Sequence, residues 1–283
     1  MKSKKFSPEL ESKLERLRRI LRRTEGCAVA YSGGVDSSLL LAAAREVLGE
    51  RCLAVIGVSR VNGKREQEAA LRWLEQAGIP HRVVKTRELA NAKFCANPEN
   101  RCYYCKRGLF RQILREAKRA GLPTVAEGSN VDDRKQVRPG RQAMEELGIL
   151  RPLEQAGLNK ADIRELARMA YRLPMADKPS NPCLASRFAF GVRITPERLR
   201  RVEHMEDYLR NQGFHIVRAR FHPEVLRLEL GAEEERRLLQ PKLRRAVVDQ
   251  AKELGFVQVT LDLQGFRSGS AHDAPRMRRI EVS

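Results

Sequence analysis

The residues best suited to chemistry form a short run near the N-terminus: Ser32, Gly33, Gly34, Val35, Asp36, Ser37 and Ser38. The run follows the apolar stretch 27–31 and opens the helical stretch 36–48. Glycines let backbone amides approach a phosphate, serine hydroxyls donate hydrogen bonds to it, and a helix N-terminus favours the anion. The pattern predicts a nucleotide phosphate site. The alternative is a serine-glycine turn that only caps a helix.

A second polar segment, residues 127–133 with the sequence EGSNVDD, follows a later apolar stretch. Gly128, Asn130 and Asp132 are its candidate nucleotide contacts. Carboxylates here and at Asp36 suit Mg²⁺, which prefers carboxylate, water and phosphate oxygens. A turn rich in Asn and Asp for purely local reasons is the alternative.

Three cysteines are candidate metal ligands. Cys102 and Cys105 form a CxxC pair at a loop-to-helix junction, and Cys183 lies in an irregular proline-rich segment. Arg187 follows Cys183 closely in the same segment. CxxC pairs commonly bind zinc or iron-sulfur clusters, and three thiolates would leave one iron of a four-iron cluster open. Cys95 is a less favoured fourth ligand, and unrelated free cysteines are the alternative.

The elements that position these residues alternate between strand and helix. Strands are predicted at 27–31, 52–58, 81–85 and 124–127, and helices at 8–23, 36–48, 64–77 and 103–120. Such alternation predicts an α/β fold with a doubly wound parallel sheet.

A smaller unit follows. Helices are predicted at 196–211 and 233–254, and strands at 216–221, 225–230 and 257–263. We therefore expect a first domain at 1–180, which includes an N-terminal helix, and a smaller α/β domain at 181–283 for substrate binding or oligomerisation.

Composition limits the class of protein. The chain has 283 residues and a net charge of +19, which predicts an anionic partner. No stretch approaches the roughly 18 apolar residues of a membrane helix, and the N-terminus lacks a secretory signal, so we expect a cytoplasmic protein without membrane contact.

The motif SGGVDSS resembles the PP-loop of ATP pyrophosphatases. A longer ordered series is similar to the LarE family of ATP-dependent sulfurtransferases: SGGVDSS, NRCYYCK, EGSNVDD, RPGRQA, GLNKADIRELA, KPSNPCLASRFAFG, RAR at 218–220 and LDLQGFRSGS. The similarity runs from residue 10 or so to residue 270 or so.

This resemblance implies a PP-loop fold and a reaction. ATP, with Mg²⁺, would adenylate the carboxylates of pyridinium-3,5-biscarboxylic acid mononucleotide with release of pyrophosphate. Sulfur would then displace AMP, and two rounds would give the bisthiocarboxylate of nickel-pincer cofactor biosynthesis. Asp36 and Cys183 would be the catalytic residues. Because Cys102 and Cys105 are also present, the chain resembles the three-cysteine subgroup, whose four-iron cluster is thought to carry a labile sulfide; members with only Cys183 sacrifice its sulfur.

The resemblance also implies how the substrate is held. The residues that match positions around the substrate's phosphate are Ser186, Arg187, Arg218, Arg220 and Arg267. Exposed arginines on a solvated strand face are the alternative. The resemblance further implies a homo-oligomer, a functional link to a nickel-inserting enzyme and no nucleic-acid partner; the sulfur donor stays unknown.

Two other functions remain open. A PP-loop tRNA 2-thiolation enzyme would also combine a CxxC with a third cysteine, and the net charge favours it. A nucleotide-binding regulatory protein with a decayed site is the third, although Asp36, Ser37 and Cys183 are all intact.

Overall fold

The computed structural model describes residues 6–135 and 139–267, which form two compact units. Unit 1 comprises the chain up to Glu88 together with Asn100–Asn181. Unit 2 comprises Leu89–Glu99 together with the chain from Pro182 onward. Among the described residues, no helix is long and apolar enough to cross a membrane.

Unit 1 is built on a four-stranded parallel sheet in the order β3-β2-β1-β4. Its strands are β1 (Cys27–Tyr31), β2 (Cys52–Val58), β3 (His81–Lys85) and β4 (Thr124–Ala126). The apolar run of β1 is buried on both faces, as expected for the centre of a parallel sheet covered by helices. The predicted α/β fold is confirmed.

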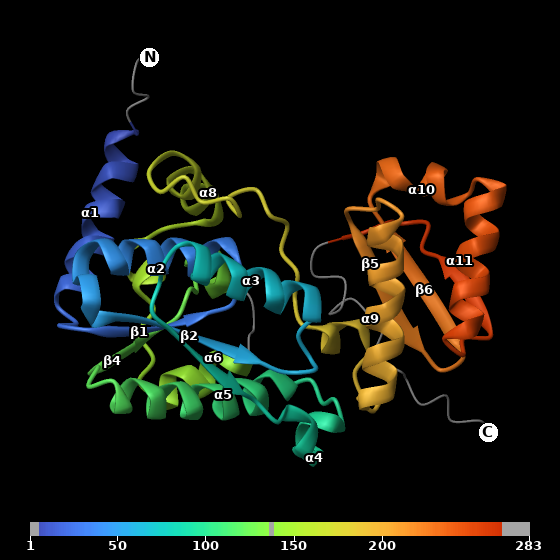
Figure 1. The fold of residues 1–283 in the computed structure, drawn as a ribbon, viewed down its shortest axis with the longest axis horizontal. Helices are drawn as coiled ribbons and strands as arrows, with labels where there is room; N and C mark the ends of the chain where they lie inside the picture. The colour runs from blue at the N-terminus through green and yellow to red at the C-terminus, as the bar shows by residue number, and fades with distance from the viewer. Residues whose placement is uncertain (1–5, 136–138, 268–283) are drawn as a thin grey trace. The chain divides into compact units, whose positions relative to one another are not determined.

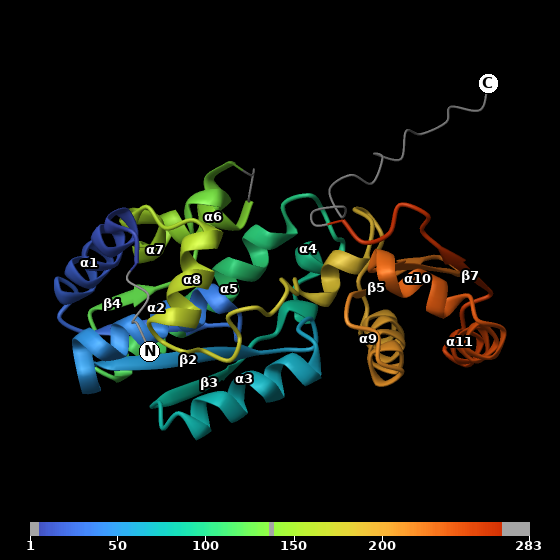
Figure 2. The same ribbon diagram turned by 90° about the horizontal axis from the view of Figure 1, so that it is seen from above.

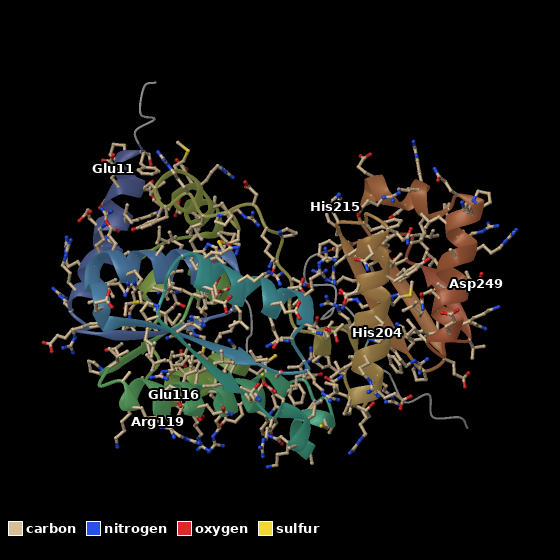
Figure 3. All side chains as sticks on the ribbon, viewed as in Figure 1. Glu11, Glu116, Arg119, His204, His215 and Asp249 are labelled. Atoms are coloured by element: carbon tan, nitrogen blue, oxygen red, sulfur yellow. The ribbon has the colours of Figure 1, made fainter. Side chains whose placement is uncertain are left out.

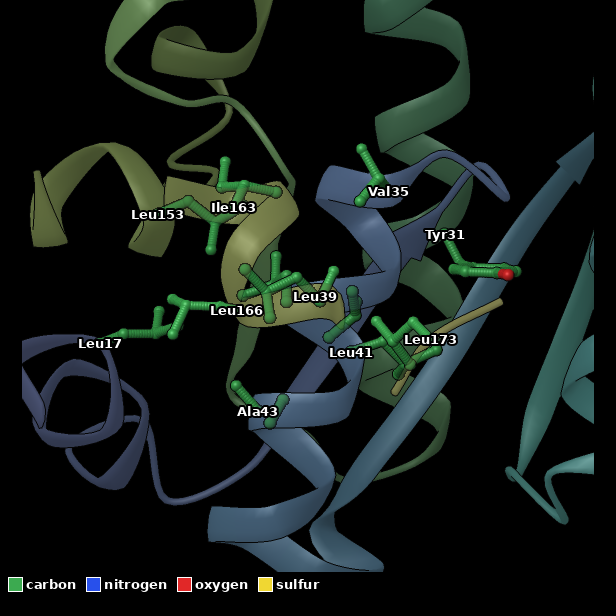
Figure 4. Packing of buried hydrophobic residues seen from close by; sticks show 14 of the residues in the cluster. Leu17, Tyr31, Val35, Leu39, Leu41, Ala43, Leu153, Ile163, Leu166 and Leu173 are labelled. Carbon is green, nitrogen blue, oxygen red and sulfur yellow. The ribbon is translucent and has the colours of Figure 1, made fainter. Parts of the chain in front are cut away.

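One group of helices lies on one side of this sheet and shares a hydrophobic core cluster with β1 and β2 (Figures 1 and 2). They are α1 (Pro8–Arg22), α2 (Val35–Leu48), α3 (Lys64–Gln76), α7 (Pro152–Ala156) and α8 (Lys160–Met169). Figure 4 shows their side chains converging, with Leu17 of α1, Leu39 of α2 and Leu166 of α8 all fully buried. This packing fixes the first turns of α2 and α8, which carry the polar residues considered below.

Two helices, α5 (Arg101–Arg119) and α6 (Pro139–Glu146), cover the opposite face. Phe110, Ile113 and Ala117 of α5 recur at helical spacing and are buried against the sheet. In an α/β sheet of this kind, helices begin at the carboxyl edge of the strands. The first turn of α5, with its CxxC pair, therefore lies at the same edge as the loop after β1.

Unit 2 contains a three-stranded sheet in the order β5-β6-β7. The strands β5 (Val217–His222) and β6 (Val225–Leu230) are antiparallel, while β6 and β7 (Gln258–Leu261) are parallel. The helix α9 (Pro196–Asn211) packs on β5. The predicted single helix 233–254 is wrong: Pro241 begins a new helix, so α10 (Ala232–Leu238) and α11 (Pro241–Glu253) are separate. Proline lacks an N–H and clashes with the preceding turn, hence the break.

The inserted segment of unit 2 carries the short helix α4 (Ala92–Cys95). The backbone N–H of Ile194 donates to the carbonyl of Cys95 (2.8 Å), and that of Gly191 donates to the carbonyl of Asn97 (2.9 Å). The Asn97 side chain in turn donates to the carbonyl of Ala189 (2.7 Å). These bonds explain why a segment from the first half of the sequence belongs to unit 2.

Candidate active site

The loop after β1 has the geometry of an anion cradle. Gly33 has φ +74°, and a Cβ there would lie 2.7 Å from the Cβ of Ala70, so a side chain has neither the conformation nor the space. Gly34 caps α2, and the hydroxyls of Ser37 (3.1 Å) and Ser38 (2.9 Å) donate to its carbonyl. The Ser32 N–H donates to the Ser37 hydroxyl (3.2 Å). Val35, the first residue of α2, is buried in the core.

The EGSNVDD segment packs directly on this cradle. A Cβ at Gly128 would lie 2.9 Å from the backbone nitrogen of Ser37, so only glycine allows this approach. Beyond Gly128, the Asn130 side-chain amide donates to Oδ1 of Asp36 (3.2 Å). The two segments that the sequence singled out separately therefore share one site.

Lys160, the first residue of α8, joins both segments. Its ammonium lies 2.5 Å from Oδ2 of Asp36, and its backbone N–H donates to Oδ2 of Asp132 (2.9 Å). A capping box fixes this helix end, because Asn159 and Asp162 each bind the other's backbone N–H. Lys160 thus contacts both carboxylates, Asp36 through its ammonium and Asp132 through its backbone N–H.

Glu127 provides an observation that favours a bound ligand. It directly follows β4 and is 7% exposed, and its Oε1 has no hydrogen-bond partner among the described residues. A buried acceptor without a donor is costly, and a bound cation or ligand donor would satisfy it. The Glu127 carboxylate, like those of Asp36 and Asp132, is an oxygen ligand of the kind that Mg²⁺ prefers.

The cysteines lie in different environments. Cys102 is exposed and Cys105 half-buried, three residues apart in the first turn of α5, with Cys105 Sγ 3.9 Å from Oε1 of Glu88. These two thiols share one side of a helix and fit as a ligand pair. Cys183 is half-buried in unit 2, where it caps a short 3₁₀ helix, Leu184–Arg187.

The remaining thiols are less available. Cys95 is buried, and its thiol donates to the carbonyl of Leu89 (3.3 Å). Burial raises the pKa of Cys27 and of Cys52 to about 12, so both stay protonated. Within the described ranges, no group of three or more His, Cys, Asp or Glu side chains is arranged to hold a metal ion. The three-cysteine cluster stays a prediction.

Unit 2 holds a buried arginine cluster on the face of its sheet that carries alternate residues of β5. Arg187, 1% exposed, binds both carboxylate oxygens of Glu206 (2.7 and 3.0 Å) and donates to the Ser186 hydroxyl (2.8 Å). Arg220 binds both oxygens of Glu229 (2.8 and 2.9 Å) and the carbonyl of Ser186 (2.6 Å).

Arg218 is held differently. Its guanidinium donates to the carbonyl of Val217 (2.7 Å) and lies over the ring of Phe266 (4.9 Å). Burial, reinforced by the neighbouring Arg187 guanidinium, lowers the pKa of Arg218 to about 10. A bound anion would stabilise the charged form of this buried guanidinium. The cluster therefore suits a phosphate or carboxylate ligand. The structure brings together Ser186, Arg187, Arg218 and Arg220, whereas Arg267 is exposed at the end of the described residues.

Similarity to known proteins identifies the family of the chain. No model of a known protein family matches the chain. A protein of Synechocystis described as uncharacterized is 41% identical over 260 residues, covering 92% of this chain and 97% of that protein. The pyridinium-3,5-bisthiocarboxylic acid mononucleotide synthase of Lactiplantibacillus plantarum is 33% identical over 254 residues, covering 89% of this chain and 91% of the synthase. The chain belongs to the LarE family. An uncharacterized protein of Methanocaldococcus jannaschii is 28% identical over 244 residues, 85% of this chain and 90% of that protein.

The sequence of this LarE family member does not predict a site role for three residues: Lys160, Glu206 and Glu229. Lys160 lies in a motif that carries the family resemblance, and its capping pattern marks a helix start, yet nothing local to the sequence indicates that it reaches Asp36. Glu206 and Glu229 lie in an ordinary helix and an ordinary strand. Only the fold shows that each neutralises a buried arginine.

Proposed function

We propose that this LarE family member adenylates the carboxylates of pyridinium-3,5-biscarboxylic acid mononucleotide with ATP and converts them to thiocarboxylates. The observation that carries the proposal is the convergence of Asp36, Asn130, Asp132 and Lys160 on the glycine cradle. The named synthase of L. plantarum, to which the chain is similar over most of its length, supplies the substrate class.

In the first step, a substrate carboxylate oxygen attacks the α-phosphorus of ATP, and the bond to the departing pyrophosphate breaks. The cradle amides and the first turn of α2 would hold the phosphates. Asp36 and Asp132 would hold Mg²⁺, which supplies charge neutralisation on the pyrophosphate side. Adenylation matters because a carboxylate oxygen is a poor leaving group and AMP is a good one.

In the second step, sulfur attacks the carbonyl carbon and AMP leaves. If Cys183 supplies the sulfur, its thiolate forms a thioester; loss of the Cα proton and cleavage of the Cβ–S bond then release the thiocarboxylate and leave dehydroalanine. If Cys102, Cys105 and Cys183 hold a four-iron cluster, that cluster would supply a labile sulfide and spare the side chain. We favour the cluster because Cys102 and Cys105 form a CxxC pair, a common ligand unit of iron-sulfur clusters.

Arg218 would contact the substrate phosphate. Burial and the neighbouring Arg187 guanidinium lower the pKa of Arg218, and a bound phosphate would stabilise its charged form. Arg267 stays a proposed contact on the family resemblance alone. We also propose, on that resemblance alone, a homo-oligomer whose product passes to a nickel-inserting enzyme.

The test separates the two steps. Purified protein is given ATP, Mg²⁺ and the pyridinium substrate, and both pyrophosphate and thiocarboxylate are measured. We expect Asp36→Asn to release little pyrophosphate, and Cys183→Ala to release pyrophosphate without forming thiocarboxylate. Substrate that fails to stimulate pyrophosphate release by wild-type protein would contradict the proposal.

The sulfur source is decided on anaerobically purified protein. About four iron and four acid-labile sulfide per chain, lost in Cys183→Ala, would support the cluster. Absence of both after reconstitution, with dehydroalanine at position 183 in the mass spectrum after one turnover, would establish Cys183 as the sacrificed donor.

One structural feature favours a second candidate function, tRNA 2-thiolation. The helix α5 carries seven basic residues and one acidic residue, and its basic side chains repeat about every four residues at Arg107, Arg111 and Arg115. Figure 3 labels Glu116 and Arg119, which both lie near the C-terminal end of α5. These two side chains pair with each other (2.5 Å). A helix face rich in basic residues is typical of phosphate-backbone contacts.

Unmodified tRNA decides between the two functions. If the protein thiolates tRNA, tRNA should stimulate pyrophosphate release where the pyridinium substrate does not. Its affinity should also fall steeply with salt and drop in an Arg111→Glu/Arg115→Glu variant. Stimulation by the pyridinium substrate alone would exclude tRNA as the acceptor.

A further inference from the structure

One of the carboxylates proposed to hold Mg²⁺, that of Asp36, already pairs with a cation. Oδ2 of Asp36 lies 2.5 Å from the Lys160 ammonium, and Oδ1 accepts from the Asn130 amide. Oδ2 of Asp132 accepts from the backbone N–H of the same lysine. Both proposed metal ligands are therefore engaged by Lys160.

We infer that Lys160 keeps Asp36 closed to divalent cations until ATP binds, and that its ammonium then moves to the phosphates. The inference rests on the proposed use of ATP. Mg²⁺ binds carboxylate oxygens at about 2.1 Å. An ammonium in contact with the same oxygen occupies that place, and it repels a second cation. The metal and the Lys160 ammonium therefore exclude each other at Asp36.

The triphosphate supplies what the exchange needs. Its negative charges attract both the metal and the displaced ammonium, so neither cation is left without a counter-charge. The lysine stem is flexible, and the side chain is 35% exposed, which leaves it room to turn. Its backbone stays fixed, because the capping box and the bond to Asp132 hold the first turn of α8.

Lys160 is thus a positioning residue that imposes an order: metal enters with the nucleotide and not before it. Without the Lys160 ammonium, Oδ2 of Asp36 would lose its cationic partner, while the Asn130 amide would still donate to Oδ1. The freed oxygen should attract a divalent cation even in the absence of ATP.

The test measures Mn²⁺ binding, by electron paramagnetic resonance of the free ion, on the full chain without nucleotide. We expect Lys160→Met to bind Mn²⁺ about tenfold more tightly than the wild type, and to bind ATP about tenfold more weakly. Lys160→Arg should restore exclusion of Mn²⁺, because a guanidinium also pairs with Asp36.

A matched control is Lys13 of α1, which also pairs with a carboxylate of α8. Lys13 pairs with Asp162 of α8 (3.0 Å) and is 20% exposed, yet Asp162 belongs to the helix cap and not to the cradle. Lys13→Met should leave both Mn²⁺ and ATP affinities unchanged.

The outcomes separate this inference from the proposed function. If wild-type protein binds ATP but Lys160→Met gains no Mn²⁺ affinity, or if wild type binds Mn²⁺ tightly without ATP, the inference is wrong and adenylation stands. If wild-type protein does not bind ATP at all, the proposed function itself fails.

Discussion

Gly33 carries the strictest steric requirement of the phosphate cradle. Its φ of +74° and the 2.7 Å approach of a Cβ to Ala70 predict that Gly33→Ala strains the loop twice. We expect a loss of about 2 kcal/mol in the free energy of unfolding, and weaker ATP binding because the amides no longer converge. Urea unfolding and calorimetric titration with ATP measure the two effects.

The neighbouring glycine is the control. A Cβ at Gly34 would meet only the Ser32 hydroxyl, at 3.6 Å, and its φ of −84° is open to any residue. Gly34→Ala should leave the free energy of unfolding close to that of wild type. Equal destabilisation by both variants would show that steric contact at Gly33 is not the cause.

Glu206 predicts a pH dependence of stability. Burial alone would raise its pKa, but the Arg187 and Arg210 guanidiniums hold it below the ordinary value of 4.5. A carboxylate with a lowered folded-state pKa stabilises the protein above its unfolded-state pKa, and this contribution is lost as pH falls through the folded-state pKa. Glu206→Gln should therefore cost about 3 kcal/mol at pH 7, because Arg187 is left buried without its counter-charge.

Urea unfolding of wild type and Glu206→Gln from pH 7 to pH 3 measures this dependence. The difference between the two proteins should shrink toward the acid end of the range. As a comparison, Glu145→Gln removes an exposed partner of Arg141 and Arg151 and should show no such difference. A difference in the free energy of unfolding between wild type and Glu206→Gln that stays constant with pH would contradict the prediction.

At the scale of elements, Gly128 joins the loop after β4 to the first turn of α2. A Cβ at Gly128 would lie 2.9 Å from Ser37 N and 3.1 Å from the Asp36 carbonyl carbon, and these backbone atoms cannot turn aside. Gly128→Ala should push the two elements apart, cost about 2 kcal/mol in stability and break the Asn130–Asp36 hydrogen bond. Unfolding measurements and ATP titration check this.

A glycine in α5 provides the opposite expectation. A Cβ at Gly108 meets nothing within 4 Å, so Gly108→Ala should stabilise the helix by about 0.5–1 kcal/mol and leave ATP binding unchanged. If Gly128→Ala behaved like Gly108→Ala, the close approach of the two elements would not matter for the site.

Most helices and strands of unit 1 can be predicted from the sequence because each is marked by a local pattern of residues. The strand 27–31 and the helix after it are marked by an apolar run, two glycines and helical periodicity, and the structure places them there. The prediction of a single helix at 233–254 is wrong because it overlooks a local signal, Pro241, at which a second helix begins. Lys160, Glu206 and Glu229 are different: each acts on a partner distant in sequence, and such pairings follow only from the fold.

At the scale of the whole molecule, the chain passes between its two units at three places, near residues 88, 99 and 181. The expectation of consecutive domains at 1–180 and 181–283 contains only the last of these passages. The first two passages lie on either side of α4 in the sequence. The short apolar sequence of α4 resembles any helical turn, so it does not indicate a change of unit. Hydrogen bonds to residues 189–194 hold this segment. The stability of unit 2 therefore depends on a segment that lies, in the sequence, between the two parts of unit 1.

Asn97 tests this dependence. It is fully buried, it adopts φ +55°, which asparagine tolerates better than alanine, and its side chain binds the carbonyl of Ala189. Asn97→Ala should cost about 2 kcal/mol, from the lost hydrogen bond and the strained backbone together. Asn97→Gly relieves the backbone strain, so it should cost less and separate the two contributions. Hydrogen exchange should accelerate in β5, β6 and residues 189–194 of both variants while the glycine cradle of unit 1 keeps its protection; faster exchange at the cradle as well would mean that the two units unfold as one.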